Sequence, residues 1–159
     1  MPPPTSDTFL EEALDLAVDN VESGLGGPFA ALVVADGEII ARGTNRVTTV
    51  HDPTAHAEIT AIRAACKERG DFHLDGCTLY TTCEPCPMCL GAIYWARLEG
   101  VVYAATQADA AAAGFDDEHI YRELNTPPPD RDIPMTQELA GDADRPFEAW
   151  RHCEDRVEY

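Results

Sequence analysis

The first apolar residues of the chain recur three and four positions apart, as they do along one face of a helix. This spacing predicts an amphipathic helix from about residue 8 to residue 23. Thr8 and Glu11 have the separation of a capping box at its start, and Gly24 marks its end. The first predicted element is thus a helix whose apolar face needs a partner layer.

Two short apolar runs follow, and a turn signal separates them. Residues 29–35 and 38–44 have the length and composition of strands, and Asp36 and Gly37 between them favour a tight hairpin. The next segment, residues 46–54, is polar and is predicted to be a loop. An antiparallel pair of strands is therefore expected directly after the first helix.

Helical and strand patterns then alternate. Residues 55–69 are rich in helix formers, share an apolar face and stop at Gly70, which predicts a helix. Residues 78–82 and 101–105 have the character of strands, and residues 87–98 between them are predicted to form a helix that a proline opens. Strand, helix and strand at this spacing predict parallel pairing in a layered α/β fold.

The pattern becomes weaker after residue 111. Residues 117–124 and 146–156 have helical character, and residues 126–134 contain four prolines and are predicted to form an irregular linker. The sequence has no internal repeat. Its 159 residues suit a single domain, residues 1–159, that buries roughly 70% of the surface of its unfolded chain.

Acidic residues dominate the charge of the chain. Lys and Arg number 11 against 29 Asp and Glu, so the formal net charge is −18, and Lys67 is the only lysine. Such a surface repels phosphate groups, which disfavours nucleic acids and anionic membranes as partners and favours a small neutral substrate. It is also typical of proteins that stay hydrated in concentrated salt, so we expect a halophilic surface.

The sequence carries no evident targeting signal. The first residues lack a basic cluster followed by an apolar stretch, and no apolar run approaches the length of a bilayer span. A cytoplasmic location is therefore expected. In that compartment the six cysteines indicate metal or thiol chemistry before they indicate disulfides.

Two short motifs carry the candidate chemistry. Cys86 and Cys89 lie three apart at the start of a predicted helix, where they share a face and the helix dipole favours their thiolates. His56, at the start of another predicted helix, adds a third ligand, and a catalytic zinc site uses three while one position stays open for water. Glu58 is placed to take a proton from that water. The set predicts a catalytic Zn²⁺ site.

Two other arrangements of the cysteines stay open from the residues alone. Cys83, Cys86 and Cys89 are spaced by three, so together with His56 they could close a structural zinc site that has no vacancy. Against this, the strand predicted before the helix places Cys83 off the face of the other two, and a structural site gives Glu58 no role. A C-x-x-C pair at a helix start could instead be a redox pair.

The sequence resembles the cytidine deaminase superfamily and, within it, the small bacterial-type guanine deaminases. Ala30 and His51 depart from the glycine and the asparagine expected at those positions. The resemblance spans nearly the whole chain, and the segments that carry it are Gly27-Pro28-Phe29, Asn45, residues 52–58 (DPTAHAE), residues 83–97 (CEPCPMCLGAIYWAR), residues 114–117 (GFDD), residues 147–151 (FEAWR) and residues 158–159 (EY).

The resemblance implies a cytidine-deaminase-like α/β fold, with three layers (α/β/α) and a mixed five-stranded sheet. It implies a zinc-dependent hydrolase that converts guanine to xanthine and ammonia, with Glu58 as the catalytic acid and base. The Zn²⁺ ligands that it implies are His56, Cys86 and Cys89. The residues that it places at the substrate are Phe29, Asn45, Ala57, Trp95, Asp117 and Tyr159.

These residues have different implied roles. Phe29 stacks on the purine, Asn45 bonds the edge of the ring, and Asp117 lies near the exocyclic amine. The same residues also suit ordinary positions, a core aromatic for Phe29, a turn for Asn45 and a helix cap for Asp117. Trp95 lines the pocket or fills the core.

By the same resemblance, the protein is a homodimer that binds a small purine. Residues 126–159 form a C-terminal arm that exchanges between two subunits, so that Tyr159 covers the site of the other subunit. The nearest alternatives are deaminases of guanosine or cytosine. A tRNA adenosine deaminase shares the zinc motifs but normally needs a basic surface, and a non-enzymatic structural zinc module has no use for Glu58.

Overall fold

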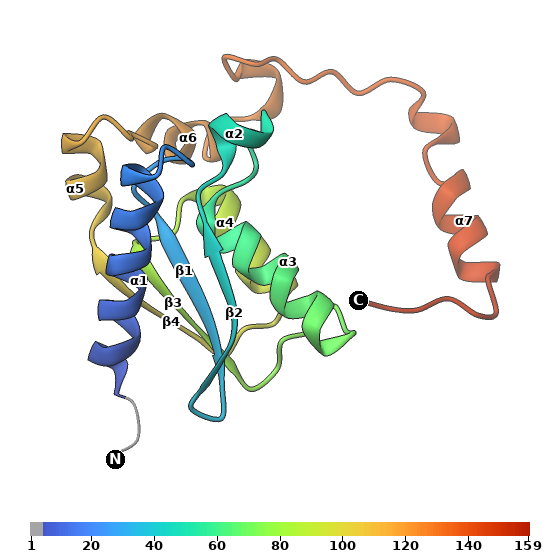
Figure 1. Ribbon diagram of the computed structural model, residues 1–159. Helices are drawn as coiled ribbons and strands as arrows, with labels where there is room; N and C mark the ends of the chain where they lie inside the picture. Colours follow the sequence, from blue (N-terminus) through green and yellow to red (C-terminus); the bar gives the residue numbers. More distant parts are fainter. Residues whose placement is uncertain (1–4) are drawn as a thin grey trace. The chain divides into compact units, whose positions relative to one another are not determined.

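The computed structural model of the protein describes residues 5–159, which divide into two compact units, one ending at Asp117 and the other spanning Glu118–Tyr159 (Figure 1). No helix among residues 5–159 is long and apolar enough to cross a bilayer. The elements of the first unit are α1 (Ser6–Glu22), β1 (Ala30–Ala35), β2 (Glu38–Thr44), α2 (Val47–Val50), α3 (Ala57–Arg69), β3 (Cys77–Cys83), α4 (Pro87–Trp95), β4 (Gly100–Ala105) and α5 (Gln107–Ala112).

The strands form one mixed sheet in the order β2-β1-β3-β4. β1 pairs antiparallel with β2 and with β3, and β3 pairs parallel with β4, so the predicted hairpin and the predicted parallel pair are both confirmed. The expectation of five strands is wrong, because the sheet formed by residues 5–159 has four. The segments after β4 are short helices and a proline-rich stretch, and prolines lack the N–H groups that a fifth ladder requires.

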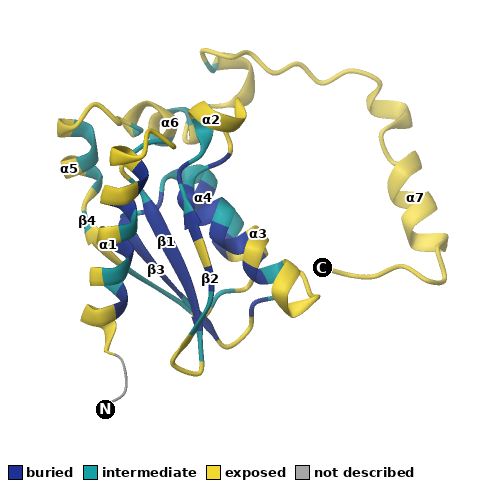
Figure 2. Cartoon of the chain, viewed as in Figure 1, coloured by how far each residue is buried: buried dark blue, intermediate teal, exposed yellow. Residues whose placement is uncertain are grey.

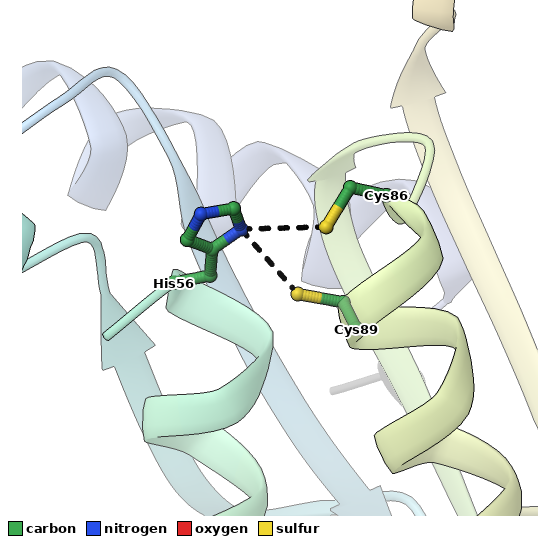
Figure 3. Close-up of side chains that lie close together, drawn as sticks. All are labelled: His56, Cys86 and Cys89. Carbon is green, nitrogen blue, oxygen red and sulfur yellow. Dashed lines mark hydrogen bonds between the residues drawn. The ribbon is translucent and has the colours of Figure 1, made fainter. Parts of the chain in front are cut away.

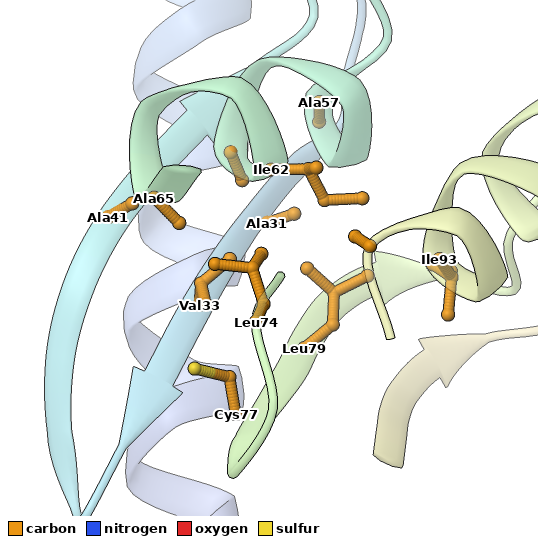
Figure 4. Close-up of a cluster of buried hydrophobic side chains, with 12 residues drawn as sticks. Ala31, Val33, Ala41, Ala57, Ile62, Ala65, Leu74, Cys77, Leu79 and Ile93 are labelled. Atoms are coloured by element: carbon orange, nitrogen blue, oxygen red, sulfur yellow. The ribbon is translucent and has the colours of Figure 1, made fainter. Parts of the chain in front are cut away.

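The side chains of β1 alternate between two apolar clusters. Ala31 and Val33 belong to the cluster that contains residues of α3 and α4, whereas Leu32 and Val34 pack with Phe9 of α1. Because successive strand residues point to opposite faces, α1 lies on one face of the sheet and α3 with α4 on the other. The first unit therefore has three layers, and most of its completely buried residues lie on β1 and β3 and on the faces of the helices that pack against them (Figure 2, Figure 4).

Two differences from the predicted boundaries lie near α1 and α2. α1 starts at Ser6, because the hydroxyl of Thr5 caps it and accepts the Thr8 N–H at 3.4 Å. Thr8 is therefore inside the helix and is not its cap. The loop expected at residues 46–54 contains the single turn of α2, which ends at His51 in left-handed backbone with φ of 53°.

Two further differences lie around α4 and α5. α4 ends at Trp95 rather than near residue 98, and Arg97 then takes left-handed backbone with φ of 57°. The hydrophobic pattern does not predict α5, because its alanine-rich sequence has no distinct apolar and polar faces. The signal that could have found it is the spacing of Thr106 and Asp109, which form a capping box.

Gly43 allows α3 to lie directly on β2. A Cβ atom at this position would lie 2.3 Å from the Ala57 carbonyl oxygen and 2.3 Å from the Ala61 nitrogen. Both atoms belong to the backbone of α3, so no side-chain movement could relieve the contact. The glycine thus sets the distance between the sheet and the first turn of α3, which is the turn that carries Glu58.

The second unit has little internal packing. None of residues 118–159 is buried, and large apolar side chains such as Phe147 and Trp150 are 62% and 41% exposed. The helices expected at residues 117–124 and 146–156 are present with shifted ends. The elements of this unit are α6 (Glu118–Leu124), α7 (Arg145–His152) and the 3₁₀ turns Pro128–Asp130 and Ala140–Asp142.

Candidate metal and active site

The three predicted metal ligands lie at the starts of two neighbouring helices. His56 is the N-cap of α3, Cys86 is the N-cap of α4, and Cys89 lies in the first turn of α4 (Figure 3). Both caps have extended backbone, with φ of −66°, and neither side chain bonds its own helix end. The side chains are therefore available to a ligand that both helices share, and Pro87 at the first position of α4 keeps that helix start in place.

The three donor atoms converge. The Nδ1 atom of His56 lies 3.5 Å from the sulfur of Cys86 and 3.5 Å from the sulfur of Cys89 (Figure 3). All three ligand atoms lie within 4.8 Å of one another, and Cys89 is completely buried. One imidazole nitrogen and two sulfurs are ligands that Zn²⁺ prefers, and their closeness fits one tetrahedral ion. The predicted trio therefore suits a zinc ion.

The protons of this trio are distributed unevenly. The Cys89 thiol and the His56 imidazole both donate hydrogen bonds to the Cys86 sulfur, which lowers the pKa of Cys86 to about 4. The hydrogen bond with Cys86, together with burial, raises the pKa of Cys89. The hydrogen bond to Cys86 also raises the pKa of His56. The group thus holds a thiolate and shared protons, and a metal ion would replace those protons.

Glu58 lies beside the trio in the first turn of α3. Its side chain is buried with 6% exposed, and this burial raises the pKa of its carboxyl group. The carboxyl group also lies within hydrogen-bonding reach of the Cys89 sulfur. A buried carboxyl group whose pKa is raised and which lies next to a metal site can accept a proton and return it, as acid–base catalysis requires.

Cys83 does not join the three ligands. Its thiol donates to the Thr106 carbonyl oxygen at 3.7 Å, and burial raises its pKa to about 11. Among residues 5–159, the group of converging ligands around His56 contains Cys86 and Cys89 but not Cys83. The arrangement therefore offers three converging protein ligands and not the four that a closed structural zinc site needs.

Backbone hydrogen bonds hold the Asn45 side chain in one orientation. Its Oδ1 atom accepts the N–H groups of Gly27 and Val47 at 3.2 and 3.3 Å. The Asn20 amide in turn donates to the Asn45 carbonyl oxygen at 3.0 Å. Because Oδ1 already accepts two N–H groups, Asn45 offers a bound molecule the donor group Nδ2.

Phe29 packs against the edge of the hydrophobic cluster that contains residues of α3 and α4. It is half-buried, it lies one residue before β1, and its ring meets the Phe115 ring edge-on with 4.9 Å between centroids. It also borders a cavity of about 460 Å³ whose other walls are mostly apolar side chains of α1 and α5. The Asn45 N–H donates to the Phe29 carbonyl oxygen at 3.0 Å, so the two predicted substrate residues are adjacent.

The other predicted substrate residues occupy different environments. Ala57, which lies between His56 and Glu58 in the sequence, is completely buried. Trp95 is 68% exposed at the end of α4, whereas the ligands lie at its start, so Trp95 does not fill the core. Tyr159 belongs to the second unit. Asp117 is half-buried and accepts a hydrogen bond from Gln107 at 2.7 Å.

Three residues near the site are not identified by the sequence patterns. Phe115 contacts Phe29, Gln107 contacts Asp117, and Glu84 accepts the Gln107 backbone N–H at 2.9 Å. Phe115 lies within the GFDD stretch and so had a signal. Glu84 likewise lies within the quoted stretch of residues 83–97. Gln107 had no signal, because its importance depends on contacts with residues of other segments.

A second trio of metal-ligand types lies in the second unit. His119, Glu123 and Asp132 also have donor atoms within 4.8 Å of one another. The Arg122 side chain, however, lies 2.8 Å from His119 Nδ1, and His119 and Asp132 are 52% and 74% exposed. A fixed positive charge at this distance repels a cation, so this group forms a surface hydrogen-bond network.

Comparisons with known proteins extend the agreement beyond the site. Residues 4–105 match the family model of the cytidine and deoxycytidylate deaminase zinc-binding region. The chain is 57% identical to the guanine deaminase of Bacillus subtilis (strain 168) over 153 residues, which cover 96% of this chain and 98% of that protein. An X-ray structure of Bacillus subtilis guanine deaminase matches with a TM-score of 0.96 at 56% identity, covering 98% of this chain and 99% of that chain.

A relative with another substrate matches less of the chain. The tRNA-specific adenosine deaminase of Bacillus subtilis (strain 168) is 42% identical over 108 residues, which cover 68% of this chain and 66% of that protein. The similarity to this relative therefore leaves about a third of each chain unmatched. The similarity to guanine deaminase covers almost all of both.

Proposed function

The chain belongs to the family of cytidine and deoxycytidylate deaminases, and we propose that it catalyses the zinc-dependent hydrolysis of guanine to xanthine and ammonia. The observation that carries this function is the convergence of His56, Cys86 and Cys89 next to the buried carboxyl group of Glu58. The match to guanine deaminase over 96% of the chain favours guanine over other bases.

The residues of the chain divide the work of this reaction. Zinc held by His56, Cys86 and Cys89 supplies Lewis acidity, which makes a water molecule a better nucleophile at neutral pH. Glu58 accepts one proton of the water that adds to C2 and carries it to the ring nitrogen, and it then carries the second proton of that water to the departing amine. One water is consumed, and one ammonia leaves for each guanine.

In this proposal, residues next to the ends of β1 and β2 hold the substrate. The Phe29 ring offers a stacking surface for the purine, and the Asn45 Nδ2 group donates to an acceptor on its edge. Support for both roles comes from the fixed Oδ1 of Asn45 and from the half-buried position of Phe29 beside it. Asp117 faces the exocyclic amine in this proposal.

A direct test compares substrates. The zinc-loaded protein is incubated with guanine, guanosine, cytosine and adenine, and ammonia release is measured over time. Guanine should be the preferred substrate by kcat/KM. Faster release from guanosine or cytosine would move the function to one of those substrates, and no release from any of them would leave a non-enzymatic zinc module.

A tRNA substrate is the alternative that the second comparison raises. The formal net charge of −18 opposes it, because contacts with phosphate groups need lysine and arginine and these 11 residues are outnumbered by 29 aspartates and glutamates. Adding a tRNA that contains adenosine at the wobble position should release no ammonia and should not inhibit the reaction with guanine. Inhibition that weakens with salt would instead favour the tRNA substrate.

The proposal includes a homodimer with exchanged arms, residues 126–159. Its support is that none of residues 118–159 is buried, although this unit carries large apolar side chains including Ile133, Leu139 and Phe147. Apolar surface of this extent favours burial against a second copy of the chain. In this arrangement Tyr159 of one subunit closes the site of the other.

Complementation between two inactive variants tests the exchange. One variant carries Glu58→Ala, and the other lacks Tyr159. Refolding the two together should restore part of the turnover, because the subunit with an intact Glu58 receives Tyr159 from its partner. Absence of restored turnover in a mixture that sediments as a dimer would show that each arm serves its own subunit.

The acidic surface and the free cysteines support two further parts of the proposal. A surface with net charge −18 suits concentrated salt, because salt screens the repulsion between its carboxylates. All six cysteines are free, which suits the reducing cytoplasm. The melting temperature should rise between low salt and molar KCl, and an unchanged value would contradict the halophilic surface.

A further inference from the structure

We propose that Gln107 is a positioning residue for the deamination reaction, because its side-chain amide holds the Asp117 carboxylate at the edge of the active site. The inference rests on the proposed function, in which Asp117 faces the exocyclic amine of the substrate. It adds a residue of α5 to a site otherwise built from the starts of α3 and α4 and from the segment around β1.

The contact itself is short and partly shielded. The Nε2 group of Gln107 donates to Oδ1 of Asp117 at 2.7 Å, and both residues are half-buried. A hydrogen bond to an ionised acceptor is stronger than one between neutral groups, and partial burial increases its effect. The bond therefore limits the rotation of the carboxylate and favours one orientation of its two oxygens.

The backbone of Gln107 is itself fixed. Its N–H donates to the Glu84 carboxylate at 2.9 Å, two residues before the metal ligand Cys86. The preceding residue, Thr106, forms the capping box with Asp109 that starts α5. The backbone of Gln107 is thus fixed relative to the segment between β3 and α4. Its side chain in turn fixes Asp117 relative to the same segment.

Two observations place Asp117 near the reacting groups. The negative charges of Asp117, Glu58 and Glu84 all help to raise the pKa of the Cys83 thiol, so the three carboxylates lie in the same neighbourhood as Cys83. Two residues before Asp117, the Phe115 ring contacts Phe29. The segment that carries Asp117 therefore lies against Phe29, one of the residues proposed to hold the purine.

The segment between α5 and Asp117 needs such an anchor. Gly114 has φ of 94°, and the Phe115 N–H bonds the Ala110 carbonyl oxygen, which turns the chain back after the end of α5. Beyond this turn the bond from Gln107 ties the Asp117 carboxylate to the start of α5. Without the bond, the carboxylate could adopt several rotamers, and fewer molecules would present it to the substrate.

The test uses Gln107→Met, which keeps the length of the side chain and removes only its amide. The backbone N–H of residue 107 remains, so the bond to Glu84 is preserved. Because hydrogen bonds to charged groups are strong, kcat for guanine should fall by at least about tenfold, while KM stays within about twofold. The exposed neighbour Ala108→Met introduces the same side chain and should keep the activity of the parent protein.

Two readouts separate positioning from a general structural effect. In an Asp117→Asn background, Gln107→Met should cause no further loss of kcat, because the residue acts through the missing carboxylate. In zinc-loaded protein without substrate, hydrogen exchange of residues 114–117 should become faster in Gln107→Met and stay unchanged in Ala108→Met.

Each contrary outcome has a distinct meaning. If the parent protein deaminates guanine, two results would overturn the inference. One is an unchanged kcat in Gln107→Met, and the other is an equal loss of kcat in the parent and in the Asp117→Asn background. If the parent protein does not act on guanine, the proposed function fails. The exchange measurement then still decides whether Gln107 anchors Asp117, and an unchanged rate would overturn the anchoring itself.

Discussion

Residues 5–117 and residues 118–159 both contain amphipathic segments, but only the first set buries them. β1 has five buried residues in its six, whereas none of residues 118–159 is buried. The spacing of apolar residues along a segment therefore predicts that a helix will form and which of its faces is apolar. It does not predict whether residues of the same chain bury that face. The contrast identifies the second unit as the part whose apolar side chains stay exposed in the single chain.

The two trios of metal-ligand types extend this comparison. Both have donor atoms within 4.8 Å, yet Cys89 in the first unit is completely buried and Asp132 in the second is 74% exposed. The first trio offers two sulfurs beside a buried acid, and the second has an arginine at 2.8 Å from its imidazole. Donor chemistry and burial, rather than closeness alone, therefore distinguish a metal site from a surface network.

Replacing a cysteine with serine should have a large effect in the first unit and no effect in the second. Cys89→Ser removes a buried sulfur ligand, so zinc should fall from about one ion per chain to nearly none and turnover by more than about a thousandfold. Cys153→Ser changes an exposed cysteine of the second unit and should leave both values unchanged. Metal analysis after gel filtration and an ammonia assay measure the two effects.

The outcome that would break the comparison is retention of zinc by Cys89→Ser. A further control, Asp132→Asn, alters the second trio without touching the first. If it were this variant that lost the metal, the surface network would be the true zinc site. Burial and donor type would then not distinguish the two trios.

Amide in place of carboxylate gives the next largest contrast. Glu58→Gln keeps the shape of a buried side chain but cannot accept a proton, so kcat should fall by about a thousandfold, within the range expected for general acid–base catalysis. The zinc content should stay near one, because Glu58 is not a ligand. Glu148→Gln, at an exposed position in the first turn of α7, is the matched control and should retain full turnover.

The two measurements on Glu58→Gln separate catalysis from metal binding. Loss of zinc together with turnover would indicate that the carboxyl group stabilises the metal site instead of moving protons. Full turnover with zinc retained would identify the site as structural. Either result would remove the main functional difference between the two units.

Local signals predict most of the first unit. The alternating residues of β1, the glycine after α3 and the proline at the start of α4 place these elements within a few residues of their observed ends. The ligand trio was predictable because each ligand lies at a helix start, where the motif and the boundary coincide. Local patterns and short motifs thus suffice where one segment carries both the fold and the chemistry.

What the sequence did not predict depends on contacts between distant segments. The fifth strand was expected from the resemblance, but nothing in residues 106–159 has a strand pattern that could pair with the edge of the sheet. Gln107 was overlooked because its importance comes from Asp117 and Glu84, which lie in other segments. Trp95 was expected in the pocket or the core, and its 68% exposure at the end of α4 excludes only the core.

Replacing a glycine with alanine tests how tightly each unit is packed internally. Gly43→Ala forces a methyl group against the backbone of α3, with 2.3 Å to the Ala57 carbonyl oxygen, and should destabilise the first unit by about 2 kcal/mol. Gly141→Ala is the matched change in the second unit, where a Cβ atom would meet nothing within 4 Å. It should change the free energy of unfolding by less than about 0.5 kcal/mol.

Urea unfolding of the zinc-loaded variants, followed by the fluorescence of tryptophan and by circular dichroism, measures both changes. The turnover of Gly43→Ala should fall as well, because the displaced turn of α3 carries Glu58. Equal stability of the two variants would show that α3 can move away from β2 without cost. The close approach would then not position the site.

The smallest expected difference concerns acid. The His73 backbone N–H donates to Asp71 at 3.0 Å and lowers the pKa of this aspartate below its ordinary value of 3.8. A carboxylate with a lowered pKa stabilises the folded state above pH 3.8, and this contribution disappears as the pH falls through the lowered pKa. Asp71→Asn keeps an acceptor for His73 but no charge, so it should melt slightly below the parent protein at pH 7.

The gap between Asp71→Asn and the parent protein should then close as the pH falls through the lowered pKa of Asp71, since both side chains are uncharged below it. Asp155→Asn, in the second unit, should melt with the parent protein at every pH. Melting curves at several pH values measure the two gaps. A gap that persists at low pH would mean that the amide disturbs the turn sterically, and the lowered pKa of Asp71 would then contribute nothing to the stability of the first unit.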